Sequence, residues 1–196
     1  LNYEPCLRIP FIVMDPRLPA GRRGVRESRF ALSVDVAPTF LNWAGVRAPD
    51  TMQGRSLVPL LQGEGTAWRE YALAENLWST IYGNPRCETV RDAEWKYTRY
   101  FPNRRWLSSS LQGEQPAYEE LFHLAADPQE GINLASDPVY APVLQRLRRA
   151  LLEELAMAKG DPAADPLTLV LDPSEQLELR NAYRSHARAT YVSPIE

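Results

Sequence analysis

The stretch Trp95-Lys-Tyr-Thr-Arg-Tyr-Phe101 carries the clearest structural signal in the chain. Successive side chains of a strand point to opposite faces of a sheet, so one face should carry Trp95, Tyr97, Arg99 and Phe101, and the other Lys96, Thr98 and Tyr100. Similar short, aromatic-rich segments surround it, separated by turn-prone residues: Tyr71–Glu75, Glu88–Arg91 and Tyr118–Phe122. This pattern predicts an antiparallel meander of about four strands between residues 70 and 125.

A helix is expected immediately after this meander. Asp137-Pro138 supplies an N-cap residue followed by proline at the first helical position. The apolar residues then recur at helical spacing, and the pattern ends before Gly160: Val143, Leu144, Leu147, Leu151 and Leu155. We expect this stripe to pack against one face of the sheet.

The first sixty residues show a different pattern. The run Ile9–Met14 is apolar throughout, which is typical of a strand buried on both faces in a largely parallel sheet. Asp35 is a good N-cap for a short helix, and Gly45 stands where a C-cap glycine belongs. Residues 50–65 are rich in glycine and predict a loop with one helical turn.

Composition excludes several classes of function. The 196 residues are 44% hydrophobic, with 22 basic and 25 acidic side chains spread along the chain and a net charge of -3. Nucleic-acid binding and a membrane partner are therefore not expected. No apolar stretch approaches the ~20 residues of a membrane span. We expect a soluble protein, and the sequence leaves open whether it is cytoplasmic, periplasmic or secreted. The chain starts at Leu1 without an initiator Met, so a fragment is the simpler interpretation.

Three separated parts of the chain, taken together, carry a resemblance to a known family. The first is Tyr3-Glu-Pro-Cys-Leu-Arg-Ile-Pro-Phe-Ile-Val13. The second is Val34-Asp-Val-Ala-Pro-Thr-Phe40 through Gly45, followed by Met52-Gln-Gly-Arg-Ser-Leu57. The third joins Val90-Arg91 and Trp95-Lys-Tyr97 to Glu120-Leu-Phe-His-Leu124, Asp127-Pro128, Glu130 and Asn133-Leu134. In this order, over about residues 3 to 155, they resemble the C-terminal portion of an arylsulfatase-like protein of the alkaline-phosphatase-like superfamily.

The resemblance implies an α/β fold. Residues 1–65 would form the C-terminal end of the catalytic domain, at the end of a mixed central sheet with flanking helices. Residues 66–160 would form a small C-terminal antiparallel sheet packed on a helix, and residues 161–196 a tail extension. It also implies hydrolysis of sulfuric esters by a formylglycine, made from Cys or Ser, together with a divalent cation, usually Ca²⁺. The cation and charged side chains would stabilise the charge that develops on the sulfate oxygens.

The residues for this chemistry are not found in the chain. The family's nucleophile motif is Cys or Ser, any residue, Pro, a small residue and Arg, and neither Cys6 nor Cys87 is followed by that pattern. The sequence has no acidic cluster with ligand spacing, and the family's catalytic Lys would lie just before Leu1. We therefore expect no catalytic or metal residue here, and Ca²⁺ ligands only in the full-length enzyme. Expected partners are the upstream part of the same protein and a sulfate-ester small molecule or glycan.

Two groups of residues are candidates for the rim of the substrate pocket. Asn2, Tyr3, Glu4 and Arg8 follow closely on the position of the family's Lys, although Glu4 and Arg8 would equally suit a buried structural pair. The second group, Trp78, Tyr82, Asn84 and Arg86, lies in a connection between two strands, of the kind that lines clefts or forms an ordinary surface loop. His123 and His186 are isolated in sequence and favour structural roles.

Two alternative functions remain open. A phosphonate or phosphodiester hydrolase of the same superfamily shares the strand and helix pattern, and the metal-site residues would discriminate it. A non-catalytic module derived from such an enzyme is the other alternative. An upstream Cys/Ser-x-Pro-x-Arg segment would support the sulfatase.

Overall fold

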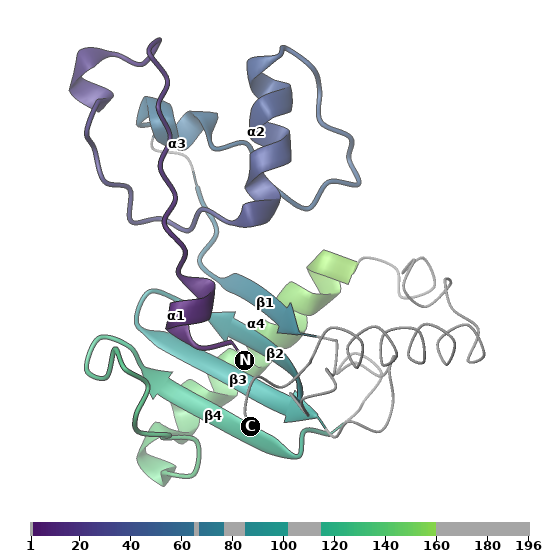
Figure 1. The fold of residues 1–196 in the computed structure, drawn as a ribbon. Coiled ribbons are helices and arrows are strands. Elements are labelled where there is room, and N and C mark those ends of the chain that lie inside the picture. The colour runs from purple at the N-terminus through teal and green to yellow at the C-terminus, as the bar shows by residue number, and fades with distance from the viewer. Residues whose placement is uncertain (1, 65–66, 77–84, 102–114, 160–196) are drawn as a thin grey trace, which may run out of the picture.

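The computed structural model describes residues 2–64, 67–76, 85–101 and 115–159. In Figure 1 the chain forms two parts, one with short helices and extended segments, and the other with a sheet backed by a long helix. The chain begins on the sheet part, crosses to the helical part and returns to form the sheet.

Four antiparallel strands form the sheet, in the order β1-β2-β3-β4. Their bounds are Ala72–Asn76 (β1), Arg86–Arg91 (β2), Trp95–Phe101 (β3) and Tyr118–His123 (β4). Tyr97 of β3 is paired with Val90 on one side and Leu121 on the other. The predicted meander is confirmed, with strand bounds close to those that the alternating pattern indicated.

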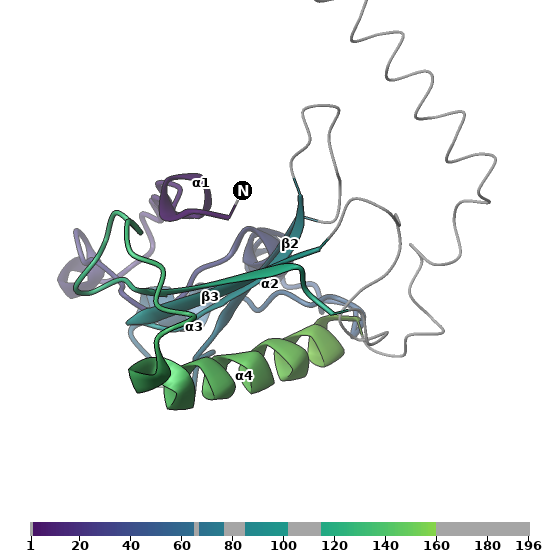
Figure 2. The same ribbon diagram turned by 90° about the horizontal axis from the view of Figure 1, so that it is seen from below.

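The helix α4, Ala141–Lys159, covers one face of this sheet (Figure 2). It follows the 3-10 turn η4, Pro138–Tyr140, where the Asp137 side chain accepts a hydrogen bond from the Val139 N–H at 2.9 Å. The core consists of residues from the sheet and from α4: Val90, Tyr97, Leu121, Leu144, Leu147, Ala150, Leu151 and Leu155. The predicted packing of the leucine stripe is therefore confirmed.

The opposite face of the sheet is polar. Lys96, Thr98 and Thr89 are almost completely buried there, although none of them is apolar. The start of the chain covers this face, with residues 2–4 and the short helix α1, Glu4–Leu7. The two faces that alternation predicted for β3 therefore differ in chemistry, one apolar and one hydrogen-bonded.

The helical part contains η1 (Ala20–Arg22), η2 (Ser33–Asp35), α2 (Val36–Trp43) and α3 (Val58–Gln62). Gly45 follows α2 with a φ of 71°, which confirms the expected C-cap glycine. Asp35 precedes α2 as predicted, but its carboxylate does not cap the helix. It binds Arg69 instead, because a guanidinium offers a buried carboxylate two charged donors.

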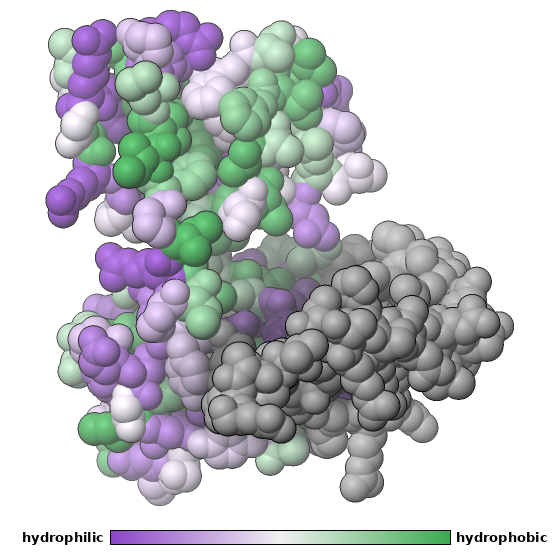
Figure 3. All heavy atoms as spheres, viewed as in Figure 1, coloured by the Kyte–Doolittle hydropathy of each residue, from purple (hydrophilic) through white to green (hydrophobic). Residues whose placement is uncertain are grey.

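The strand predicted for Ile9–Met14 is wrong for this structure. The segment has extended backbone without strand pairing to any described residue, and its side chains are exposed: Ile9 59%, Phe11 46%, Ile12 92% and Met14 90%. A buried strand needs neighbours that satisfy its N–H and C=O groups and cover both faces, and the described residues supply neither. Figure 3 shows hydrophobic residues at the surface of this part, which also exposes Phe40 and Val46.

Candidate functional site

Asn2 anchors the start of the chain to the polar face of the sheet. Its side-chain amide donates hydrogen bonds to the Thr89 hydroxyl at 2.9 Å and to the Ala74 carbonyl at 3.3 Å. Its own backbone carbonyl accepts a hydrogen bond from the Lys96 ammonium at 2.9 Å. The backbone and side chain of Asn2 are thus held by three strands at once.

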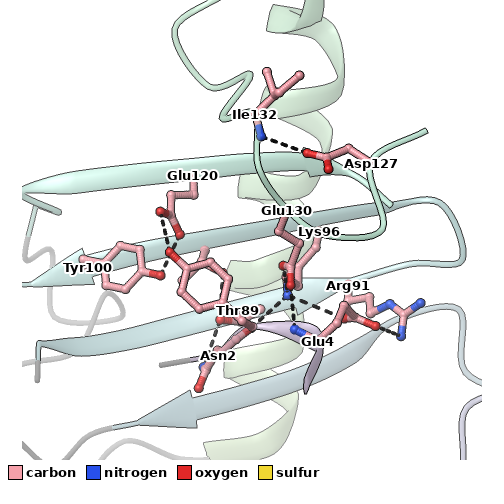
Figure 4. Close-up of polar contacts among 12 residues, drawn as sticks. Asn2, Glu4, Thr89, Arg91, Lys96, Tyr100, Glu120, Asp127, Glu130 and Ile132 are labelled. Carbon is pink, nitrogen blue, oxygen red and sulfur yellow. Dashed lines mark hydrogen bonds and ion pairs between the residues drawn. The ribbon is translucent and has the colours of Figure 1, made fainter. Parts of the chain in front are cut away.

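Glu4 belongs to a buried group of four charges, which we call the Lys96 cluster and which consists of Glu4, Arg91, Lys96 and Glu130 (Figure 4). The Glu4 carboxylate lies 3.0 Å from the Arg91 guanidinium and 3.5 Å from the Lys96 ammonium. Glu130 forms an ion pair with Lys96 and accepts the Glu4 backbone N–H at 2.6 Å. Two cations therefore balance two carboxylates, which makes their burial tolerable.

Tyr3 lies between the Lys96 cluster and the carboxylate of Glu120. Its hydroxyl donates to the Glu120 carboxylate at 3.0 Å, and the Tyr100 hydroxyl donates to the same carboxylate at 2.6 Å. Burial and the neighbouring Glu120 raise the pKa of both tyrosines above the ordinary value of 10.0. Both phenols therefore act as hydrogen-bond donors rather than as bases.

The structure brings together only some of the residues predicted for the rim of the substrate pocket. Asn2, Tyr3 and Glu4 lie together on the polar face, whereas Arg8 is exposed and lines a pocket of about 220 Å³ beside Glu4 and Arg91. The suggested structural pair of Glu4 with Arg8 is replaced by ion pairs with Arg91 and Lys96, which approach from the sheet.

Of the second candidate group, only Arg86 lies within the described residues. Arg86 is buried at the start of β2, with its guanidinium 5.6 Å from the centre of the Phe101 ring. Trp78, Tyr82 and Asn84 lie outside the described residues. Their role at the pocket rim stays a prediction.

Sequence reasoning missed Lys96, Glu120 and Glu130 as partners of the N-terminal residues. One signal was present, because Lys96 shares the face of β3 that carries Thr98 and Tyr100, away from Tyr97. Glu130 gave no such signal, since it lies in a turn after β4 and meets Glu4 across 126 positions of sequence.

The remaining candidates have ordinary structural surroundings. Cys87 is fully buried, and burial raises its pKa above the value of a free thiol. The His123 ring stacks on Trp95 at 4.2 Å with the two planes 7° apart, while His186 lies outside the described residues. Within residues 2–64, 67–76, 85–101 and 115–159, no group of three or more His, Cys, Asp or Glu side chains could hold a metal ion.

Among the helices of the described residues, none is both long and apolar enough to span a bilayer.

Comparison with known proteins gives a consistent set of matches. Residues 1–157 match the family described as N-sulphoglucosamine sulphohydrolase, C-terminal. The chain is 30% identical over 190 residues to an N-acetylglucosamine-6-O-sulfatase of Bacteroides thetaiotaomicron, which covers 91% of this chain and 30% of that protein. It also resembles a protein solved in complex with its substrate D-glucosamine-2-N,6-O-disulfate, with a TM-score of 0.56, 28% identity and coverage of 68% of this chain and 26% of that one.

A third similar protein is named for a different enzymatic activity. The phosphonate monoester hydrolase of Agrobacterium radiobacter superposes with a TM-score of 0.52 and 28% identity, over 66% of this chain and 26% of that one. In all three comparisons the chain spans less than a third of the length of its relative.

Proposed function

The chain belongs to the sulfatase family described as N-sulphoglucosamine sulphohydrolase, C-terminal, and on that premise we propose that the whole protein hydrolyses sulfate esters of sugars. Its relatives include an N-acetylglucosamine-6-O-sulfatase and a protein solved with its substrate D-glucosamine-2-N,6-O-disulfate, which supports a sulfated amino sugar as the substrate class. The share of this chain would be to shape the substrate pocket, while the nucleophile and metal ligands belong to the rest of the protein.

The ion pairs near the candidate residues support the assignment of the nucleophile and metal ligands to the rest of the protein. Developing charge on a sulfate oxygen needs cations that are free to approach it. The cations closest to Asn2 and Glu4 are Lys96 and Arg91, and both are already paired, with Glu4 and Glu130. Lys96 and Arg91 therefore hold the protein's own chain in place.

Ion pairing also affects which carboxylates could bind the Ca²⁺ that the family resemblance implies. A calcium ion takes ~6 to 8 oxygen ligands that converge on one point. The carboxylates of Glu4 and Glu130 do not fit such a site because they bind Lys96, and Asp35 does not fit because it binds Arg69. We assign both the calcium site and the formylglycine to the upstream part of the protein.

The helical part supports a partner within the same protein. Ile9, Phe11, Ile12 and Met14 expose a continuous apolar run in extended backbone. Such a run is stable when other strands pair with it and cover its faces. We propose that the upstream part of the protein covers these apolar side chains in the full-length enzyme.

Enzyme assays of the full-length protein and of the isolated 196 residues test the proposal. The full-length protein and the isolated 196 residues are each assayed with p-nitrophenyl sulfate, glucosamine 6-sulfate and p-nitrophenyl phenylphosphonate. We expect turnover of the sulfate esters by the full-length protein alone. Turnover by the 196 residues would show that the active site is misplaced. A clear preference of the full-length protein for the phosphonate would favour the alternative indicated by the Agrobacterium hydrolase.

A further inference from the structure

We propose that Lys96 and Glu130 are positioning residues that set the place of Asn2 and Tyr3 at the wall of the substrate pocket. The inference rests on the proposed function, because it assigns to these two residues an effect on sulfate-ester hydrolysis. Neither residue would touch the substrate. Both act through the backbone of the N-terminal segment.

The Lys96 ammonium is surrounded by the N-terminal segment and Glu130. An ammonium has three N–H donors, and Lys96 directs its own to the Asn2 carbonyl at 2.9 Å, to Glu130 and toward Glu4 at 3.5 Å. The Tyr3 ring centre lies 5.8 Å away. Because the Lys96 side chain is completely buried, it has no water to exchange for these partners. Its position therefore determines where the backbone of residues 2–4 lies.

Glu130 has an unusual backbone conformation. It is the one non-glycine residue with positive φ in the described part of the chain, at 56°. Such a conformation is disfavoured for a side chain with a Cβ, and it persists only where the surrounding contacts enforce it. Here the enforcing contacts are the ion pair with Lys96 and the hydrogen bond from the Glu4 N–H at 2.6 Å. The Asp127 carboxylate steadies the same turn by accepting the Ile132 N–H at 2.8 Å.

Hydrogen bonds fix the position of the N-terminal segment more strictly than apolar contacts would. An apolar contact would cover the sheet equally well with the segment shifted by a few tenths of an ångström. Hydrogen bonds to the Asn2 carbonyl and from the Glu4 N–H specify one register of the backbone. In that register the Asn2 side chain reaches Thr89, as Figure 4 shows. The Tyr3 hydroxyl reaches the Glu120 carboxylate. The Lys96 cluster therefore determines the direction in which both candidate pocket residues point.

The test uses the full-length enzyme with three variants. Glu130→Gln keeps an acceptor for the Glu4 N–H and removes the charge. Glu130→Gly removes the carboxylate at a position whose positive φ glycine adopts freely. The double variant Lys96→Met with Glu130→Gln removes one cation and one anion, so that no buried charge is left uncompensated by the change. Arg146→Met is the matched control, because it removes an ion pair with Asp92 that involves α4.

Two measurements are made on each folded variant. Hydrogen exchange of the amides of residues 2–8 reports whether the segment has loosened. Steady-state hydrolysis of glucosamine 6-sulfate, corrected for the folded fraction, gives kcat and KM. We expect faster exchange and a fall in kcat/KM of about 10- to 100-fold for Glu130→Gly and the double variant, since small displacements near a reacting group have effects of that size. Glu130→Gln should lie between these variants and the wild type, and Arg146→Met should match the wild type.

The two measurements distinguish a failure of the positioning role from a failure of the proposed function. Unchanged exchange in all three variants, or faster exchange with unchanged kcat/KM, overturns the positioning role. An equal fall in kcat/KM for Arg146→Met also overturns it, because any loss of stability would then suffice. A wild-type enzyme that leaves the sulfate ester intact refutes the proposed function instead, and that result is read from the wild type alone.

Discussion

The guanidinium of Arg69 binds both carboxylate oxygens of Asp35, with one of the two contacts at 2.7 Å. The Asp35 side chain is completely buried, and it also accepts the backbone N–H groups of Leu32 and Arg55, each at 2.8 Å. One carboxylate thereby joins the segment before α2, the Gly54–Leu57 loop and the approach to β1. It links the helical part of the chain to the sheet part.

Asp35→Asn should destabilise the chain by about 3 to 5 kcal/mol, because removal of one charge of a buried pair leaves the other uncompensated. The free energy of unfolding in urea measures this. Asp50→Asn is the matched control, since Asp50 pairs with Arg47 while both side chains are more than four-fifths exposed. We expect no measurable change for the control. Similar losses in the two variants would show that Asp35 does not join the two parts.

Gly54→Ala should destabilise the same loop. A Cβ at this position would lie 1.9 Å from the Val34 backbone carbonyl oxygen, so the loop has to move away from the segment before α2. We expect a loss of about 1 to 3 kcal/mol in unfolding free energy, which is the usual range for overpacking. Gly21→Ala is the control, because its Cβ would meet no atom within 4 Å. A Gly54→Ala protein as stable as Gly21→Ala would contradict the close approach.

Leu147→Ala tests the packing of α4 on the sheet. Leu147 is completely buried among Val90, Tyr97 and Leu121, so its truncation should cost about 2 to 5 kcal/mol. Leu152 lies on the same helix with 41% exposure, and Leu152→Ala should cost far less. Differential scanning calorimetry distinguishes the two. Equal melting temperatures for the two variants would place the leucine stripe at the surface.

Acid should weaken the attachment of α4 through Glu119. Although burial tends to raise the pKa of Glu119, hydrogen bonds from Arg148 and Tyr97 outweigh it and hold this pKa below the ordinary value of 4.5. A carboxyl with a lowered folded pKa contributes stability above its unfolded pKa, and the contribution is lost as pH falls through the folded pKa. We therefore expect the melting temperature to fall with pH below about 4.5, the ordinary carboxyl value.

Glu119→Gln isolates this contribution from those of other carboxyls. The variant should melt at a lower temperature than the wild type at pH 7, and the difference should shrink as pH falls below about 4. Asp127, whose pKa is lowered by backbone N–H groups, continues to titrate in both proteins, so its contribution cancels in the comparison. A difference that stays constant from pH 7 to pH 3 would rule out the Glu119 carboxylate as the titrating group.

The four strands and α4 were predictable because their signals are local. Alternation along Trp95–Phe101 and the leucine spacing after Asp137 each lie within one element, and each element has one face that must be buried. The resemblance to sulfatases was found in the same way, from short segments in a fixed order. Ile9–Met14 shows the limit, since its apolar run indicated burial but could not indicate which neighbours would supply it.

Only the tertiary structure decided the partners of the charged residues. Glu4 meets Glu130 across 126 positions and Asp35 meets Arg69 across 34, and no periodicity connects such distant residues. An isolated carboxylate in a sequence suits a helix cap, a surface position or a buried pair equally well. Which of these it becomes depends on the donors that the completed fold brings within about 3 Å, because the cost of burying a charge is met only by contacts at that range.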